Sequence, residues 1–228
     1  MNIYVVVEGQ KTEKLVYASW IPLVNPELTH AIRLDNVDHN SYFIEGGGGL
    51  PYYFQTIVGA IENIATIRPN GYALFDRLVV VVDSEEMTLV DKRNEIRNFI
   101  DDHCASNNLT IDSRIIVQHF CFEAWALANT NLFRGNFHNP KLKAYVASYN
   151  VSKQDPELLP PKLAEQLNRA QHAKKYLKLL LGEKFPNKGY SANNPGPVCH
   201  EHYFKRIEHR RVNTGHVDSF GAIFAAFQ

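Results

Sequence analysis

Cysteine is scarce in this chain, and its scarcity excludes one class of protein. Only Cys104, Cys121 and Cys199 occur among the 228 residues. Three cysteines cannot form the disulfide framework that small secreted domains use in place of a large core. We therefore expect a reducing, cytoplasmic setting.

Long apolar runs are missing as well. No stretch approaches the roughly 20 apolar residues that a bilayer-spanning helix needs, so we expect no membrane segment. The apolar part of the N-terminal MNIYVVVEG is too short for a signal peptide, and no basic region precedes it. With 45% hydrophobic and 21% charged residues, the composition is typical of a soluble globular protein.

Net charge is zero overall, but the two signs are placed unevenly. Residues 1–140 carry 10 basic and 17 acidic residues, a balance of −7, whereas residues 141–228 carry 14 and 7, a balance of +7. An acidic half can bind cations and a basic half can meet phosphate groups. Two ordinary solvated surfaces are the alternative interpretation.

Apolar periodicity predicts alternating strands and helices. Apolar runs predict strands at 3–7, 78–82 and 113–117, and a weak alternation of apolar and polar residues predicts another at 29–34. Three segments between them predict helices, at 12–22, 50–67 and 90–104. Near-continuous hydrophobic strands separated by helices indicate an α/β fold with a parallel sheet covered on both faces.

From about residue 140 the pattern changes to basic helices, expected at 140–149, 161–181, 198–210 and 218–227. No long polar linker marks a separate domain. We therefore expect residues 1–139 to form the core, with residues 140–228 as a basic helical region packed on it.

Acidic residues directly follow two of the expected strands. Glu8 follows IYVVV, and Asp83, Glu85 and Glu86 follow LVVVV. Open parallel sheets bind ligands outside the carboxyl ends of their strands. Carboxylates that converge there suit Mg²⁺ or Mn²⁺, either of which can polarise a phosphodiester and activate water. The alternative is that these acids start turns or cap helices.

Three further features could carry chemistry. Glu123 lies in an apolar stretch, so we expect it to bind metal or to pair with a backbone amide or a cation. The loop Gly46–Gly49 is not followed by Gly-Lys-Ser/Thr, so it is either a flexible connection or a close-approach turn lining a cleft. Cys199, His200 and His202 are zinc-binding residue types, but no Cys-x-x-Cys pair accompanies them, which disfavours zinc.

Three short motifs resemble those of a known family. Val7–Glu13 is similar to the pattern VEG-x-T-E with one extra residue, and Phe122–Ala128 is similar to FEAW-L-A. Ser219-Phe220 with Phe224 is similar to a closing SF--F. Together with the glycine-rich turn and the acidic pair after the strand at 78–82, these motifs resemble Toprim nucleases of the small bacterial RloB-like and OLD-like type. The resemblance covers residues 1–130 well and the rest thinly.

The resemblance implies a Toprim-like (Rossmann-like) core with divalent-metal-dependent endonuclease activity on DNA or RNA, tRNA being one candidate target. It implies that Glu8 is a metal ligand or general acid/base and that Asp83 and Glu85 are catalytic metal ligands. Glu86 and Glu123 are expected as further ligands. Glu85 stands where the family has Asp, which lengthens the ligand arm.

The resemblance also implies a setting in antiphage defence, where an AAA or ABC-type ATPase partner holds the nuclease inactive. It leaves a homodimer open. Two rival functions remain: a non-catalytic Toprim-like adaptor, which Glu85 favours, and another Mg²⁺-dependent phosphotransfer domain, which the single Glu8 disfavours.

Candidate substrate contacts are basic or glycine residues that could approach a phosphate backbone. They are Lys11, Gly47, Gly48, Lys188, Lys205, Arg206 and Arg210. The alternative for the basic side chains is that they coat amphipathic helices.

Overall fold

Five strands form a parallel sheet in the order β2-β3-β1-β4-β5. The computed structural model of the chain describes residues 1–67, 73–186, 190–191 and 194–228. The strands are β1 (Ile3–Val7), β2 (Thr29–Ala31), β3 (Ser41–Gly46), β4 (Arg77–Asp83) and β5 (Asp112–Gln118). Every residue of β1 and the apolar run of β4 are buried, as expected when helices cover both faces. The predicted α/β class with a parallel sheet is confirmed.

The strand order reverses between β1 and β4. From β1 the chain passes to β2 and β3 on one side, whereas β4 leads to β5 on the other. Val7 of β1 is in register with Gly46 of β3 and with Val81 of β4. The carboxyl ends of β1 and β4 therefore form the topological switch point, where open α/β sheets bind ligands.

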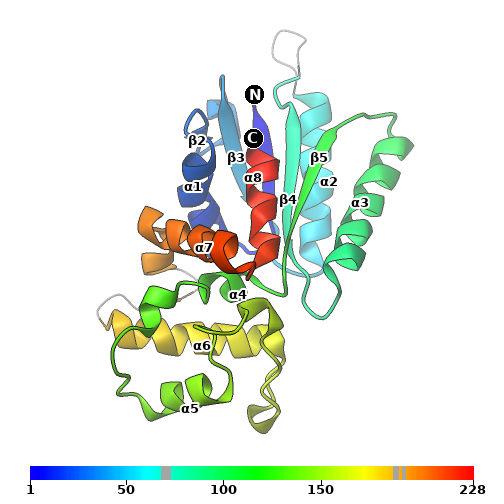
Figure 1. Cartoon of the computed structure of the whole chain (residues 1–228). Helices are drawn as coiled ribbons and strands as arrows, with labels where there is room; N and C mark the ends of the chain where they lie inside the picture. Colours follow the sequence, from blue (N-terminus) through cyan, green and yellow to red (C-terminus); the bar gives the residue numbers. More distant parts are fainter. Residues whose placement is uncertain (68–72, 187–189, 192–193) are drawn as a thin grey trace. The chain divides into compact units, whose positions relative to one another are not determined.

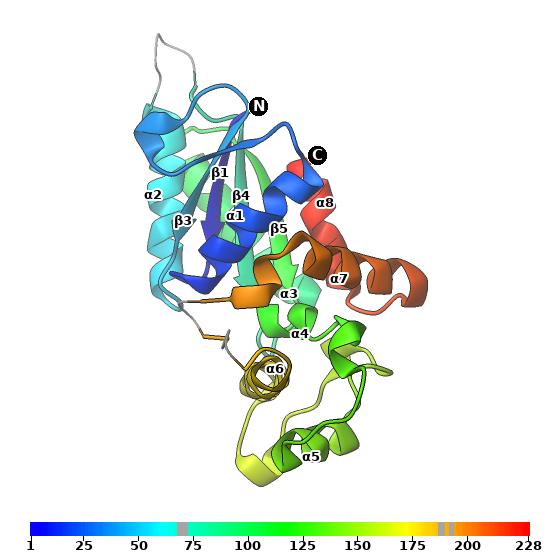
Figure 2. The same ribbon diagram turned by 90° about the vertical axis from the view of Figure 1, so that its left-hand side faces the viewer.

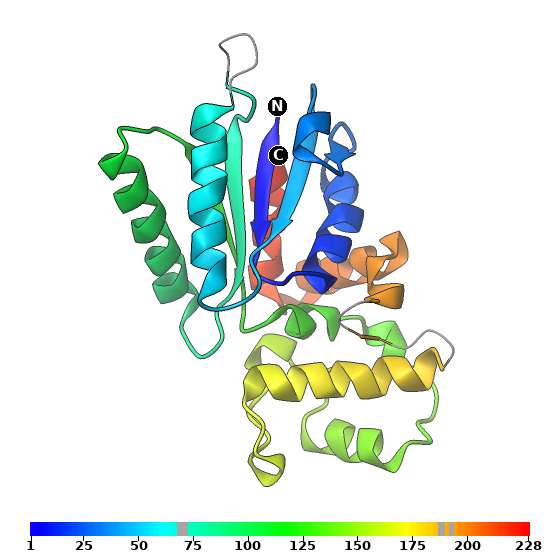
Figure 3. The same ribbon diagram turned by 180° about the vertical axis from the view of Figure 1, so that it is seen from behind.

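Helices cover both faces of this sheet. On one face lie α1 (Thr12–Val24) and α8 (Ala222–Phe227), and on the other lie α2 (Tyr52–Thr66) and α3 (Leu89–Ser106) (Figures 1 and 3). Figure 2 shows the sheet between α2 and α8. The side chain of Asn25, just after α1, donates to the Phe227 carbonyl at 2.9 Å. The end of the chain is thereby fixed against the sheet domain.

The chain divides into two compact units. The first contains Met1–Val82, Val90–Val117 and Ala222–Gln228, and the second contains Asp83–Leu89 and Gln118–Gly221. This division differs from the expected boundary at 139/140, because the chain leaves the sheet after β5 and only α8 returns to it. The loop after β4 joins the second unit through hydrogen bonds from Ser84 N to Gln118 O and from Glu85 N to Phe120 O, both 2.9 Å.

The second unit is mostly helical. Its helices are α4 (Phe122–Ala126), α5 (Pro140–Ser148), α6 (Arg169–Lys184) and α7 (Glu201–Thr214). Helix α6 begins with a capping box, in which Asn168 and Gln171 each satisfy the other's backbone N–H. Among the described residues of the whole chain, we find no helix that is both long and apolar enough to cross a membrane.

Several elements differ from the sequence-based prediction: β2 ends at Ala31 and not at residue 34, α6 begins at Arg169 and not at residue 161, and α4 was not predicted. The strand β3 was not predicted, because only its three central residues, Tyr42–Ile44, form an apolar run. Pro22 does not end α1, which continues to Val24. A proline removes the hydrogen bond to the carbonyl four residues earlier, and here the Tyr42 hydroxyl donates to that carbonyl, on Ala18, at 2.9 Å.

Candidate active site

Glu8 is the first residue beyond β1, at the switch point of the first unit. Its backbone N–H donates to Val81 O at 3.1 Å, which ties the turn to β4. The glycine loop is tied to the same turn, since Gly47 N donates to Val7 O at 2.7 Å and Gly49 N donates to Glu8 O at 2.9 Å. The backbone alone therefore holds Glu8 in a defined position.

Close packing requires two glycines of this loop. A Cβ on Gly47 would lie 2.4 Å from Cβ of Tyr53, and a Cβ on Gly46 would lie 2.9 Å from Cα of Gln10. Gly48 has φ of +79°, which glycine adopts without steric cost. These contacts favour the close-approach turn over a merely flexible connection.

An open polar groove of about 570 Å³ lies on the first unit beside this loop. Gly47 and Gly48, two predicted substrate contacts, line it together with Gln10, Gln55 and Asn63. The groove therefore presents backbone and side-chain amides, which can hydrogen-bond to phosphate and sugar oxygens. Lys11, a third predicted contact, is exposed at the start of α1.

Sequence analysis missed two buried polar residues of the first unit, Tyr53 and Lys92. Lys92 is 3% exposed, and its Nζ donates to Tyr53 Oη at 3.2 Å and to Glu95 Oε2 at 2.8 Å. Burial raises the pKa of Tyr53 to about 12; the hydrogen bond from Lys92 opposes this rise, and the charge of Glu8 adds a small increase. Glu8, Tyr53 and Lys92 are thus electrostatically linked.

The spacing along α3 could have revealed the burial of Lys92. Ile96 and Ile100 lie four and eight residues further on and are buried, so Lys92 shares their helix face.

Asp83 lies in the second unit and ends β4. Its Oδ1 accepts a hydrogen bond from Phe122 N at 3.1 Å, at the start of α4. Next to it, the buried Ser84 Oγ lies 3.0 Å from His119 Nδ1. These bonds join the end of β4 to the segment after β5, so Asp83 has a structural task besides any catalytic one.

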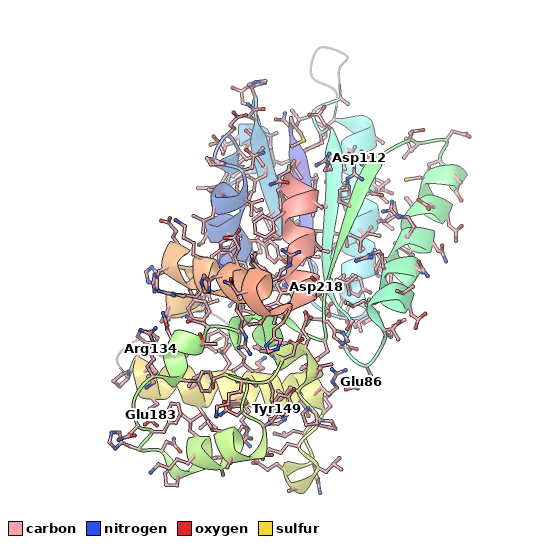
Figure 4. The ribbon with its side chains drawn as sticks, viewed as in Figure 1. Glu86, Asp112, Arg134, Tyr149, Glu183 and Asp218 are labelled. Carbon is pink, nitrogen blue, oxygen red and sulfur yellow. The ribbon has the colours of Figure 1, made fainter. Side chains whose placement is uncertain are left out.

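The remaining predicted carboxylates also lie in the second unit. Glu85 has φ of +51°, in the left-handed region that non-glycine residues seldom adopt. Glu85 and Glu86 are both exposed, and Figure 4 labels Glu86 on the loop after β4. Glu123 is half-buried in α4 and accepts a hydrogen bond from Tyr190 Oη at 3.2 Å, so this partner is a hydroxyl and not one of the groups that we expected. Burial raises the pKa of Tyr190, and the neighbouring Glu123 raises it further.

No group of three His, Cys, Asp or Glu side chains among the described residues is arranged to hold a metal ion. The donor set for Mg²⁺ or Mn²⁺ is therefore not assembled within the described parts of the chain, and the same holds for zinc at Cys199, His200 and His202. Glu8 belongs to the first unit, and Asp83 to the second. Their convergence on one ion stays a prediction.

The basic residues predicted to contact substrate from the second unit differ in their exposure. Lys205 is exposed and pairs with Glu201 at 2.5 Å, and Arg206 is half-buried. Lys188 lies outside the described residues. Arg210 is only 5% exposed.

Arg210 requires a correction, because its guanidinium binds the interior of the second unit. It donates to Ala128 O at 3.3 Å and to Gln154 O at 2.7 Å. Burial lowers the pKa of Arg210 to about 10. Arg210 follows Tyr203 and Ile207 at helical spacing and shares their buried face, so we no longer expect it to contact phosphate.

Two of the motifs meet in a buried network of the second unit. Trp125 Nε1 donates to Glu157 Oε1 at 3.0 Å and to Ser219 Oγ at 2.7 Å, and Ser219 Oγ donates to Glu157. The rings of Trp125 and Phe220 pack edge to face with centroids 5.2 Å apart. Trp125 belongs to FEAW, and Ser219 and Phe220 belong to SF--F, so this network gives both motifs a structural role.

We compared the chain with protein-family models, curated proteins and solved structures, and none of them matches it. Its function must therefore be inferred from the chemistry of the residues described above.

Proposed function

We propose that this chain is a Toprim-type, divalent-metal-dependent endonuclease acting on DNA or RNA. The observation that carries the proposal is the acidic character of the switch point: Glu8 directly follows β1, and Asp83 ends the neighbouring strand β4. Ligands bind at this location in open α/β sheets. The order of the three motifs adds support from resemblance.

Glu8 is the proposed general base, which takes a proton from the attacking water. The rigid turn around Glu8 supports this role, since a base must be held at a fixed position relative to the scissile bond. In the same unit, Lys92 Nζ donates to the Tyr53 hydroxyl at 3.2 Å.

A divalent ion, when bound, would polarise the phosphodiester and lower the pKa of water. The carboxylates proposed to hold it are Glu8, Asp83, Glu85, Glu86 and Glu123. Because the described residues do not gather three such ligands, the metal requirement is the part of the proposal that most needs testing.

A second candidate is a non-catalytic Toprim-like adaptor. Two observations favour it: Asp83 Oδ1 already accepts a hydrogen bond from Phe122 N, and Glu85 is exposed in a left-handed conformation. Both observations describe a strand end with a structural role.

The biological setting rests on resemblance alone. We propose a cytoplasmic effector of antiphage defence that a partner AAA or ABC-type ATPase restrains, with a homodimer as one form of assembly. An ATPase gene beside this one would support the partnership.

A cleavage assay tests the activity. The full chain is incubated with tRNA, single-stranded RNA, single-stranded DNA and duplex DNA, in Mg²⁺, in Mn²⁺ or in chelator. We expect cleavage of at least one substrate that depends on the divalent ion. Glu8→Gln and Asp83→Asn should each lower the rate by at least about 100-fold.

The substitutions are chosen to keep the fold. Gln at position 8 leaves the backbone hydrogen bonds of its turn in place, and Asn at position 83 retains an oxygen that can accept from Phe122 N. Glu62→Gln, at an exposed position on α2, is the matched control and should cleave at the wild-type rate. Wild-type cleavage by both test variants at saturating Mg²⁺ would show that the proposed roles are wrong, whereas no cleavage by any form would favour the adaptor.

A further inference from the structure

The second unit contains a pocket of about 480 Å³ that none of the sites above uses. Its apolar walls are Leu132, Phe185, Pro197 and the ring of Tyr203. This volume falls within the roughly 300–1,000 Å³ of typical small-molecule sites, which are mostly apolar with a few polar groups that fix orientation.

Two amide side chains supply such polar groups. Asn129, only 4% exposed, accepts a hydrogen bond from Asn131 N at its Oδ1 (3.2 Å). The half-buried side chain of Asn131 also lines the pocket. Each side-chain amide carries donors and an acceptor, so both residues can hydrogen-bond to a bound ligand.

The titratable side chains in the described lining of this pocket are one lysine and two histidines. His200, His202 and Lys184 contribute to its lining, and no described acidic residue does. Lys184 Nζ donates to Arg134 O at 2.7 Å and lies 4.9 Å from the centre of the Phe137 ring, which fixes the ammonium group. Figure 4 labels Arg134 in this unit. The lining therefore suits a ligand that is neutral or anionic and disfavours a cation.

We propose that this pocket binds a nucleotide unit. Aromatic and aliphatic walls can stack on the flat face of a base, and amide side chains such as those of Asn129 and Asn131 can pair with base edges in the way that proteins read unpaired bases. The two imidazoles and the Lys184 ammonium suit the phosphate. A purely aliphatic ligand would hydrogen-bond to neither amide.

This inference does not depend on the proposed nuclease activity, since binding needs neither cleavage nor a divalent ion. The nucleotide could be free or part of a strand, because both present the same base and phosphate. The test therefore includes both forms.

The experiment is isothermal titration of the full chain with AMP, GMP, CMP and UMP in chelator, followed by competition with a single-stranded RNA of ten nucleotides. We expect at least one mononucleotide to bind with Kd below about 1 mM. Competition by the RNA would assign the site to a nucleotide within a strand. Mononucleotide binding without competition would assign it to a free nucleotide.

Substitutions locate the binding. The double variant Asn131→Ala/His202→Ala should weaken binding about tenfold, which corresponds to about 1.4 kcal/mol, the scale of one or two hydrogen bonds. Asn213→Ala/His209→Ala removes the same two residue types from exposed positions on α7 outside the pocket lining and should bind as the wild type does. Neither pair is buried, so both variants should fold, as thermal unfolding will check. The proposal is wrong if no mononucleotide or RNA binds, or if the two double variants bind equally.

Discussion

Ionisation of the buried Glu157 should make the second unit less stable as pH rises. Glu157 is 6% exposed, and its carboxyl group accepts hydrogen bonds from Trp125 Nε1 and Ser219 Oγ. Burial raises the pKa of Glu157 from 4.5 to about 7, and the two hydrogen bonds only partly oppose this rise. At a pH between 4.5 and about 7, Glu157 is therefore protonated in the folded protein and ionised in the unfolded chain.

The sign and size of the effect follow from this difference. Between pH 4.5 and about 7 the folded state binds more protons than the unfolded state, so the free energy of unfolding falls as pH rises. The contribution of protonated Glu157 is complete below pH 4.5, declines through this window and is lost above pH 7. With 1.36 kcal/mol for each pKa unit, the loss between pH 5 and pH 8 is about 2–3 kcal/mol.

Urea denaturation at pH 5, 6, 7 and 8 measures this slope. Glu157→Gln keeps an oxygen that can accept from Trp125 and Ser219 but cannot ionise. Subtracting its unfolding free energies from those of the wild type removes the contribution of the histidines and other groups common to both proteins. The wild type should lose about 2–3 kcal/mol more than Glu157→Gln across this range.

Glu165 provides a control of opposite sign. A hydrogen bond from Lys175 lowers the pKa of Glu165 to about 2. Its contribution to stability is therefore present above pH 4.5 and lost as pH falls toward 2, so Glu165→Gln should run parallel to the wild type between pH 5 and 8. If Glu157→Gln also ran parallel to the wild type, the carboxyl group would already be ionised in the folded state and the reasoning would be refuted.

Two further predictions concern the glycine loop and the basic half. Gly47→Ala should destabilise the protein by about 1–3 kcal/mol, because the added methyl meets Tyr53. Gly59→Ala, in α2 with no atom within 4 Å of the added methyl, should stabilise it by about 0.5–1 kcal/mol; equal melting temperatures for these two variants would contradict the packing argument. Neutralising Lys205 and Arg206 should lower the slope of log affinity against log salt for RNA by about 0.7 for each phosphate that the protein no longer neutralises, and an unchanged slope would assign both charges to the solvated surface.

The apolar strands could be predicted from the sequence because their signal is local. In β1 and β4 each residue of the apolar run lies on a face of the sheet that helices cover. The buried stretch therefore appears in the sequence as an unbroken series of Val, Ile, Leu and Tyr. The strand β3 has only a short apolar centre and depends on pairing with β1 and β2. Likewise, α1 passes Pro22 because Tyr42, 20 residues later, donates to the carbonyl that Pro22 leaves unpaired.

The candidate site was harder to predict, because charge is a poor guide to burial. Arg210 and Lys92 both carry charges that usually remain in water. Arg210 is buried because it donates to the carbonyls of Ala128 and Gln154, which are 82 and 56 residues away along the chain. Hydrogen-bond partners so far apart along the chain leave no local pattern in the sequence. Glu8, by contrast, could be singled out because it directly follows an apolar strand.

The motifs behind the resemblance differ in what they can say about activity. Trp125 of FEAW and Ser219 of SF--F hydrogen-bond to the Glu157 carboxyl group, and Phe220 packs against the Trp125 ring, so packing and hydrogen bonding are sufficient to explain those residue types. A protein without nuclease activity could keep this network for stability alone. The VEG motif differs, because Glu8 itself is not needed for the backbone bonds of its turn. We therefore expect catalysis to depend on the Glu8 carboxylate. Because Glu8→Gln leaves the backbone hydrogen bonds of the turn in place, its effect on cleavage can be compared directly with its effect on thermal unfolding.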